Sequence, residues 1–393
     1  MNQPLRILLV SSVRPGEPAA GSVLLERHLC EREQVAVSIV PECKGGLVWR
    51  LANRLGLKSV ASACMVLNQG RRWDRSALEA CHSAAPDAIL TVAHGDAYKS
   101  ALRIAARMDL PLVAFYHDWW PDIPPLPSVL RRREAREFRM AYDQSAIALC
   151  VSKQMRRQLR EHPHAEILFP IPGFASATCS GKPIFANGNS RTFRIRYGGN
   201  LAEYGPMLGE ALVCVADLAG VRLEVRGNSP QWPVSLQERM KKSGNWLDFI
   251  AGPQWQSWLQ SSDAFLVPMV FDPAMRRRME TSFPSKLPEF TQFGKPIVIW
   301  GPEYCSAVQW ARIGDRALCV TDPNPTALRR ALERLAASPG EQERFALSAR
   351  GAAEGDFNPE RIEAQFLSAL RKAVCARNFP AAEHSDMIQG SAK

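Results

Sequence analysis

Short apolar runs alternate with longer amphipathic stretches along most of the chain. In the first half these runs are rich in β-branched and other apolar side chains, which is typical of strands. They are Leu5–Val10, Val35–Val40, Ala88–Val92, Leu112–Tyr116, Ala146–Val151 and Glu166–Phe169. Between two of them, Ala97–Arg107 carries apolar residues at helical spacing. Because strands that alternate with helices usually pair in parallel, the pattern predicts a parallel sheet covered by helices.

The alternation stops once and then resumes. Residues 173–192 are rich in Ser, Gly, Pro, Asn and Lys without any period, and we interpret them as a linker. A second series of apolar runs follows it: Phe193–Tyr197, Arg222–Arg226, Trp246–Ile250, Ala264–Val267, Pro296–Trp300 and Ala317–Val320. The sequence therefore predicts an α/β protein of two doubly wound, Rossmann-like domains that face a cleft.

The predicted boundaries follow from the two series. The first domain covers residues 1–172 and the second covers residues 193–355. A helical pattern at 356–380 follows, and it can pack back on the first domain. Residues 381–393 are small and polar with no apolar period, so we expect a disordered tail. A length of 393 residues agrees with two domains.

The composition indicates the cellular compartment in which the protein is expected. No apolar run approaches the roughly 20 residues that a membrane-spanning helix needs. The N-terminus lacks the long apolar core of a signal peptide, and the ten cysteines form no C-x-x-C pair. We therefore expect a reduced, cytoplasmic protein.

The net charge of +10 calls for an acidic partner or a solvated surface. Arginines crowd two stretches, Arg131–Arg139 and Arg156–Arg160, where they alternate with apolar residues at helical spacing. One interpretation is a solvated helix face, and the other is peripheral contact with the anionic inner face of a membrane. No recognition motif accompanies the arginines, so we do not expect nucleic acid as a partner.

Ligands of doubly wound domains bind beyond the carboxyl ends of the strands. Gly198-Gly199-Asn200-Leu201 follows one strand and precedes a helix through Leu208–Val215. Glycines let the backbone approach a ligand closely, and a helix N-terminus attracts anions. This loop is a candidate phosphate site, although a tight turn alone would also require glycine.

A second candidate lies at Ser282-Phe283-Pro284-Ser285-Lys286-Leu287-Pro288-Glu289-Phe290. Ser285 is predicted to cap a short helix, which places Lys286 at the positive end of the helix dipole. A lysine is unfavourable there, and a bound diphosphate beside Ser282 and Ser285 would remove the conflict. A simply exposed Lys286 is the alternative.

Loops in the first half carry candidate sugar-binding residues. Tyr116-His117-Asp118-Trp119-Trp120 follows an apolar run directly. Carboxylates accept hydrogen bonds from hydroxyls, and indole rings stack on sugar rings. We expect catalytic roles for His117 and Asp118, with packed structural aromatics as the alternative. The residues expected to bind an acceptor are Arg14, Gly21, His94, Trp119 and Trp120.

The run from Ser282 to Val298 resembles the donor-site signature of family four retaining glycosyltransferases, which have the two-domain GT-B fold. Four other segments are similar to segments of that family: Cys150–Met155, Tyr197–Leu201, Phe249–Pro253 and Ser262–Pro268. The resemblance implies that Glu289 holds the ribose of a nucleotide-diphosphate sugar. It also implies that Gly199, Asn200 and Leu201 bind the diphosphate and that the loop containing Gly252 lines the nucleobase.

The chain departs from the family pattern at two places. The family usually has two glutamates eight positions apart, but the position eight before Glu289 is Thr281. The arginine and lysine of the family's diphosphate loop are replaced by Asn200 and, approximately, Tyr204. Lys286 is therefore predicted to be the main cation at the phosphates, and Arg226 is a further candidate.

The resemblance implies a hexosyltransferase that moves a sugar, with retention, to a glycan, lipid-linked or other hydroxyl acceptor in polysaccharide biosynthesis. We expect no cofactor and no catalytic metal, because no carboxylate pair resembles the metal-binding Asp-x-Asp of the other main glycosyltransferase fold. The alternatives are a catalytically inactive GT-B protein that binds a nucleotide sugar and a GT-B sugar-nucleotide epimerase. A nicotinamide dehydrogenase is disfavoured because no G-x-G-x-x-G follows a strand.

Overall fold

The computed structural model describes residues 3–17, 20–30, 33–43, 45–173, 192–228, 230–250 and 252–377. The chain forms two compact units. Unit 1 comprises Met1–Val151, Met155–Leu168 and Glu363–Lys393, and unit 2 comprises Ser152–Gln154 and Phe169–Ile362. The predicted tail and nearly all of the predicted linker lie outside the described residues.

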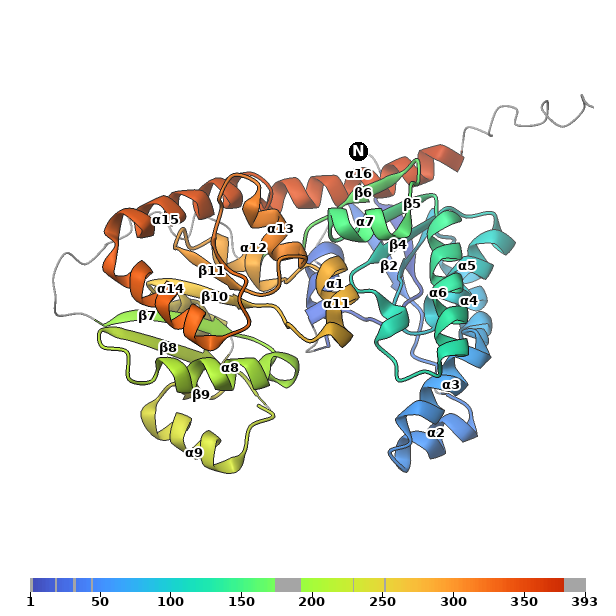
Figure 1. Ribbon diagram of the computed structural model, residues 1–393. Helices are drawn as coiled ribbons and strands as arrows, with labels where there is room; N and C mark the ends of the chain where they lie inside the picture. The colour runs from blue at the N-terminus through green and yellow to red at the C-terminus, as the bar shows by residue number, and fades with distance from the viewer. Residues whose placement is uncertain are drawn as a thin grey trace, which may run out of the picture. The chain divides into compact units, whose positions relative to one another are not determined.

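Unit 1 is built on one parallel sheet of six strands (Figure 1). The strands are β1 (Leu5–Leu9), β2 (Val35–Ile39), β3 (Ala88–Val92), β4 (Leu112–Tyr116), β5 (Ile147–Cys150) and β6 (Ala165–Ile167). Their order is β2-β1-β3-β4-β5-β6, so the direction of winding reverses between β1 and β3. In doubly wound sheets the carboxyl ends of the strands at such a reversal form the ligand site.

The helices of unit 1 have the following bounds: α1 (Ala20–Leu29), α2 (Leu47–Arg54), α3 (Lys58–Asn68), α4 (Arg71–Ala84), α5 (Ala97–Met108), η1 (Trp120–Asp122), α6 (Ser128–Asp143), α7 (Lys153–Leu159) and α16 (Pro359–Arg377). The first residues of α7 and α16 are assigned to unit 2. Within unit 1, Gln365 of α16 donates to the Ile167 carbonyl (2.9 Å), so this helix runs along β6.

Unit 2 is built on a second parallel sheet of six strands. They are β7 (Phe193–Gly198), β8 (Val221–Arg226), β9 (Trp246–Leu247), β10 (Ala264–Pro268), β11 (Ile297–Trp300) and β12 (Leu318–Val320). The order β12-β11-β10-β7-β8-β9 places the reversal between β7 and β10. The carboxyl ends of β7 and β10 are therefore the expected ligand position in this unit.

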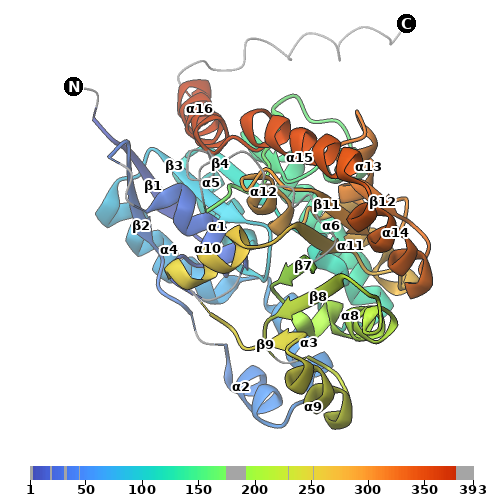
Figure 2. The ribbon, with the colours of Figure 1, turned by 90° about the vertical axis from the view of Figure 1, so that its left-hand side faces the viewer.

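Helices follow the strands of unit 2 in turn, and Figure 2 shows α8 beside β8. Their bounds are α8 (Leu201–Val215), α9 (Val234–Ser243), α10 (Gly252–Gln260), η3 (Pro273–Met275), α11 (Arg276–Thr281), α12 (Lys286–Thr291), α13 (Ser306–Arg312), α14 (Pro325–Ala337) and α15 (Pro339–Glu354).

The α/β fold with two parallel sheets is confirmed, and each predicted strand is present. Strands β3, β4, β10 and β11 are buried along their whole length, which explains why they appear as uninterrupted apolar runs. The prediction was too long for β9, which contains only Trp246 and Leu247 because it is an edge strand that pairs with β8 over two residues. The helix expected at 356–380 begins at Pro359.

Candidate functional site

The loop between β7 and α8 lies at the winding reversal of unit 2. The Gly199 N–H donates to the Arg226 carbonyl (3.0 Å), which fixes the loop against the end of β8. A Cβ atom on Gly198 would lie 2.1 Å from the Trp255 ring, so only glycine allows this ring to rest on the loop. Asn200 begins α8 as its N-cap, since its Oδ1 accepts from the Ala202 N–H (2.8 Å). The oxygen of the Asn200 side chain is thus used by the helix rather than free for a ligand.

Lys286, at the start of α12, reaches the same loop. A Cβ atom on Gly199 would lie 3.7 Å from the Lys286 Cε, so the second unit brings these two predicted residues together. The Lys286 Nζ is 2.8 Å from the Glu289 Oε2, and it lies 5.0 Å from the centroid of the Trp255 ring. A cation, a carboxylate and an aromatic ring therefore meet at the carboxyl end of β7.

The Glu289 contact corrects the expectation that Lys286 opposes the helix dipole without compensation. Its side chain is 30% exposed and that of Glu289 is 5% exposed, so the pair is partly shielded from water. The carboxylate lies three residues after the lysine and offsets its charge on the same helix face. The dipole therefore gives no separate reason for a phosphate here, and what favours a phosphate is the proximity of Lys286 to the glycine loop.

Ser285 occupies the predicted N-cap position of α12, but it does not cap the helix through its side chain. Its backbone is already helical (φ −60°, ψ −22°), and its side chain makes no cap hydrogen bond. Ser282 ends α11, and its carbonyl accepts from the Ser306 hydroxyl. Gly252 begins α10 with φ 62°, a left-handed conformation that favours glycine.

Arg226, at the end of β8, is held by protein groups. Its Nη1 donates to the Asp248 carbonyl (2.5 Å), and its guanidinium lies 5.0 Å from the centroid of the Trp258 ring. Burial and the nearby Arg196 lower the pKa of Arg226. These contacts place Arg226 with Trp258, whose ring centroid is 5.3 Å from that of Trp255.

Two residues of this site were not identified from the sequence. Trp255 covers the glycine loop, and the only available signal was a pair of tryptophans three apart in α10. Arg278 of α11 pairs with Glu203 in the first turn of α8 (2.5 Å) and places a guanidinium one turn from Asn200. Thr281 occupies the position where the family has its first glutamate. Its side chain is buried, and its hydroxyl donates to the Arg277 carbonyl (2.8 Å).

The loops after β1, β3 and β4 form a second cluster, in unit 1. A Cβ atom on Gly21 would lie 3.5 Å from the His117 Nδ1 and 3.3 Å from Val13, so Gly21 gives His117 room. The His94 ring lies 4.1 Å, centroid to centroid, from the Trp120 ring. Of the predicted acceptor residues, Gly21 therefore lies beside His117, and His94 follows β3, one of the two strands at the winding reversal of this sheet.

Trp119 and Trp120 were wrongly predicted to offer free faces to a sugar. Trp119 is fully buried and Trp120 is 7% exposed, because both pack in an apolar cluster with Tyr116 and Phe138. The Arg139 guanidinium lies 5.5 Å from the centroid of the Trp119 ring. The two tryptophans therefore pack inside unit 1, where they hold the β4 loop in place. Arg14, Asp118 and His94 are half-buried in the same group of loops.

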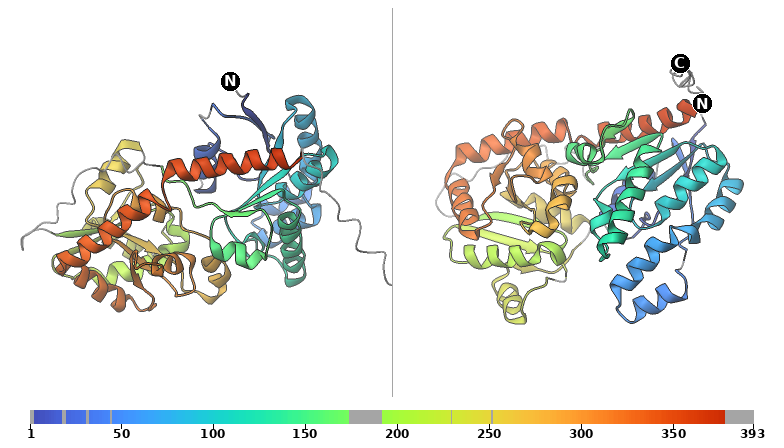
Figure 3. Two further views of the ribbon diagram at one scale, coloured as in Figure 1. Left: turned by 90° about the horizontal axis from the view of Figure 1, so that it is seen from above. Right: turned by 45° about the vertical axis from the view of Figure 1, so that its right-hand side comes forward.

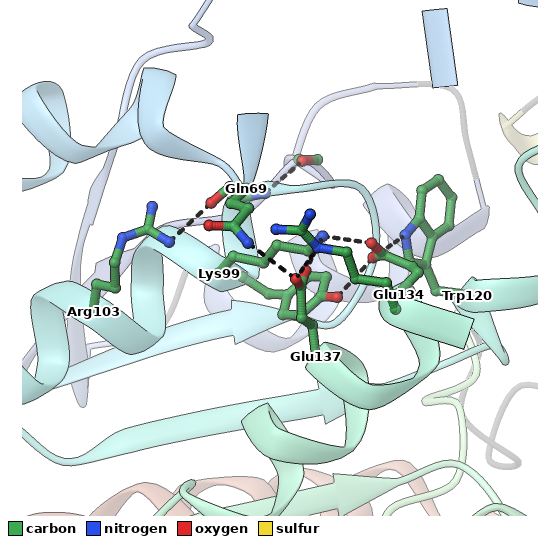
Figure 4. A network of polar contacts seen from close by, with 10 residues as sticks. Gln69, Lys99, Arg103, Trp120, Glu134 and Glu137 are labelled. Carbon is green, nitrogen blue, oxygen red and sulfur yellow. Dashed lines mark hydrogen bonds and ion pairs between the residues drawn. The ribbon is translucent and has the colours of Figure 1, made fainter. Parts of the chain in front are cut away.

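A buried polar network fixes this loop (Figure 4). Glu134 of α6 accepts from the Tyr98 hydroxyl (2.7 Å) and from the Trp120 Nε1 (3.1 Å), and it forms an ion pair with Lys99. Lys99 also pairs with Glu137 (2.7 Å). Burial and the Glu134 carboxylate raise the pKa of Tyr98 well above its usual value. For Glu137, burial acts to raise the pKa, but bonds from Lys99 and Arg133 outweigh it and lower the pKa.

Desolvation lowers the pKa of His117 to about 4, while Asp118 acts to raise it and His94 to lower it. His117 is therefore neutral near pH 7 and can exchange hydrogen bonds without carrying charge. Because the folded pKa lies below the ordinary value of 6.5, protonation favours the unfolded chain. This cost is absent above pH 6.5 and grows as the pH falls towards 4, to at most about 3 kcal/mol.

We therefore expect His117→Gln to lose less stability than the wild-type protein between pH 6.5 and 4.5. Urea unfolding measured at several pH values checks this. His82→Gln, which removes an exposed histidine of α4, is the matched control and should keep the wild-type slope. Identical slopes for all three proteins would contradict a desolvated His117.

Comparisons with known proteins agree with the α/β fold of two parallel sheets. Residues 53–169 match the family model described as Glycosyltransferase Family 4. No curated protein matches the sequence. Among solved structures, sucrose-phosphate synthase of Thermosynechococcus elongatus is similar with a TM-score of 0.65 and 12% identity, covering 95% of this chain and 100% of that one.

Two further structures show the same fold. HepE of Anabaena, solved with UDP and with UDP-glucose, has a TM-score of 0.60 at 14% identity, covering 93% of this chain and 99–100% of that one. A glycosyltransferase of Rickettsia africae has a TM-score of 0.61 at 11% identity, covering 95% of this chain and 99% of that one. The chain thus has the GT-B fold of these glycosyltransferases, and its residues 53–169 carry the sequence signature of glycosyltransferase family 4.

Proposed function

We propose that this protein is a glycosyltransferase that binds a nucleotide-diphosphate sugar on unit 2 and a hydroxyl acceptor on unit 1. The observation that carries the proposal is the meeting of Lys286 with the Gly199 loop at the carboxyl end of β7. A helix N-terminus, backbone amides and one lysine form a suitable surface for a diphosphate. HepE, which shares the fold, binds UDP and UDP-glucose, and this supports UDP-glucose as the first donor to test.

The proposed mechanism assigns each group one task. The nucleoside diphosphate leaves with increasing negative charge, which Lys286 and the amides at the start of α8 stabilise. Glu289 holds the ribose hydroxyls of the donor. His117, neutral at pH 7, and Asp118 contact the acceptor or the transferred sugar. The proposal includes retention of configuration and a hexose as the sugar, needs no metal, and leaves the acceptor as a glycan, lipid-linked or other hydroxyl.

A donor panel tests this function. We expect one of several UDP-, GDP-, ADP- or dTDP-hexoses to release its nucleoside diphosphate in the presence of the protein. The same donor should stabilise the fold, because a ligand at 100 times its dissociation constant adds ~2.7 kcal/mol. Neither release nor stabilisation with any member of the panel would contradict the proposal.

A non-catalytic nucleotide-sugar-binding protein is the second candidate. It is favoured by the burial of Thr281 where the family has an acidic residue. The panel separates the two candidates, because a binding protein would be stabilised by a donor but would release no nucleoside diphosphate from it.

Glu289→Ala should weaken donor binding by about 10–100-fold. The variant removes a charge-assisted hydrogen bond to the ribose, which is worth roughly 1.5–3 kcal/mol. Titration calorimetry with the donor measures the change. Glu238→Ala, on the exposed face of α9 in the same unit, is the matched control and should bind as the wild type does. Unchanged affinity in a folded Glu289→Ala variant would refute the role.

Peripheral contact with an anionic membrane remains part of the proposal. The structure describes both arginine stretches and shows that part of the first one serves the protein itself. Arg131 donates to the Leu126 carbonyl (3.1 Å), and Arg133 pairs with Glu137 (3.0 Å). Arg132, Arg136 and the arginines of Arg156–Arg160 are exposed and suit an anionic surface better. None of the described helices is both long and apolar enough to cross a membrane.

A further inference from the structure

The helical pair α2–α3 in unit 1 presents large apolar side chains to solvent. Figures 1 and 3 show the pair at the edge of this unit, and α2 packs mainly on α3. Between residues 47 and 60, six large apolar side chains are 44–73% exposed. They are Leu47, Val48, Leu51, Leu55, Leu57 and Val60. A concentration of this kind is unusual on the surface of a soluble protein and marks an interaction site.

The exposed apolar residues of α2 share one face of the helix. In a helix with 3.6 residues per turn, Leu47, Leu51 and Val48 fall within one arc. Trp49 points the other way, towards α4, where the Arg72 guanidinium lies 5.4 Å from its ring centroid. The protein therefore already covers the Trp49 side of α2, and the leucine side is the uncovered one.

The positive charge of residues 45–73 indicates that the partner of the apolar face is anionic. Between Gly45 and Trp73 the sequence contains no Asp or Glu, and it contains Arg50, Arg54, Lys58, Arg71 and Arg72. On α2, the exposed Arg50 and Arg54 lie side by side along one border of the apolar arc. An apolar face bordered by basic side chains fits an anionic lipid surface, where the leucines enter the acyl boundary and the arginines meet headgroups.

We propose that α2 and the α2–α3 turn form an interfacial anchor that inserts its leucines into an anionic membrane leaflet. The anchor is distinct from the exposed arginines of α6 and α7, which supply charge but present few apolar residues. It does not rest on the proposed glycosyltransferase activity, since binding to lipid is measured without nucleotide. Failure of one proposal therefore leaves the other open.

Vesicle co-sedimentation of the full chain tests the anchor. With vesicles of phosphatidylcholine and 30% phosphatidylglycerol at about 0.1 M salt, we expect the wild-type protein to bind at least tenfold better than with phosphatidylcholine alone. Leu51→Ser/Leu55→Ser should reduce binding to anionic vesicles at least tenfold. Arg50→Ala/Arg54→Ala should reduce it by a similar factor, and added salt should then matter less.

Leu347→Ser is the matched control, because Leu347 is an equally exposed leucine (57%) on α15 of unit 2. It should bind vesicles as the wild type does. All leucine variants change exposed residues, so unchanged melting temperatures verify the fold. Wild-type binding by Leu51→Ser/Leu55→Ser, or no binding of the wild type to anionic vesicles, would overturn the proposal. A wild-type dimer that Leu51→Ser/Leu55→Ser dissociates, together with no lipid binding, would assign the face to a second copy of the chain instead.

Discussion

Replacing Lys286 with alanine is expected to lower turnover by about 100–1,000-fold. The charge on a leaving diphosphate peaks in the transition state, so the loss should appear in the chemical step as well as in binding. Removal of one preorganised electrostatic contact typically has an effect of this size. Steady-state rates and nucleoside-diphosphate affinity measured on the same variant separate the two contributions. The fold should persist, because the Lys286 side chain is 30% exposed and lies at a helix start.

The ion pair with Glu289 complicates this variant, since Glu289 loses a partner when the lysine is removed. The double variant Lys286→Ala/Glu289→Gln resolves the problem. If Lys286 acts on the phosphates directly, the double variant stays as slow as Lys286→Ala or becomes slower. Recovery of turnover in the double variant would show that an uncompensated Glu289 carboxylate caused the defect. Lys242→Ala, on the exposed part of α9, serves as the matched control and should be fully active.

A fall in turnover of less than threefold in folded Lys286→Ala would place the main cation elsewhere. Arg278 of α11, which pairs with Glu203 in the first turn of α8, would then be the first residue to test in unit 2. Arg226 and Arg14 would follow.

Glu134→Ala should destabilise the fold by about 3–5 kcal/mol, the largest effect on stability that we expect. Its carboxylate is buried and joins three donors, which are Tyr98, Lys99 and the Trp120 indole. Removing the carboxylate leaves the buried Tyr98 and Trp120 donors unsatisfied, and it takes from Lys99 one of its two carboxylate partners while the Glu137 pair remains. Because Glu134 of α6 joins groups of α5 and η1 (Figure 4), we expect the variant also to loosen the loop that carries His117.

Urea unfolding of the isolated protein measures this effect. Glu79→Ala is the matched control, since its ion pair with Arg75 joins side chains that are 64% and 90% exposed, where an ion pair adds little to stability. The Trp120 ring also contacts His94, so a folded Glu134→Ala protein should show altered His94 and His117 resonances in NMR spectra. A loss of stability no larger than that of Glu79→Ala would contradict the role of Glu134 in stabilising the fold.

The strands could be predicted from the sequence because parallel strands covered on both faces must be apolar along their length. The position of Lys286 beside the Gly199 loop followed from the same reasoning, since both segments lie beyond the carboxyl ends of strands. The Lys286–Glu289 pair was also accessible, because the two residues are three apart on one helix.

Other features could not be predicted, because they depend on residues distant in the sequence. Trp119 and Trp120 suit either a sugar or a core, and the decision comes from Phe138 and Glu134 on another helix. Trp255 reaches the Gly198 loop from α10 through tertiary packing alone. An amphipathic helix such as α2 has the same sequence pattern whether its apolar face covers a core or meets a membrane, so only the structure reveals the exposed leucines.

The most direct test of the central claim is calorimetric titration of UDP, GDP, ADP and dTDP into the wild-type protein and into Lys286→Ala. We predict that one nucleoside diphosphate binds the wild type with a single site and that Lys286→Ala weakens this binding at least tenfold, while Lys242→Ala leaves it unchanged. If none of the four binds the folded wild-type protein at millimolar concentration, or if one binds equally well to Lys286→Ala, the claim that Lys286 holds a diphosphate at the β7–α8 loop is contradicted.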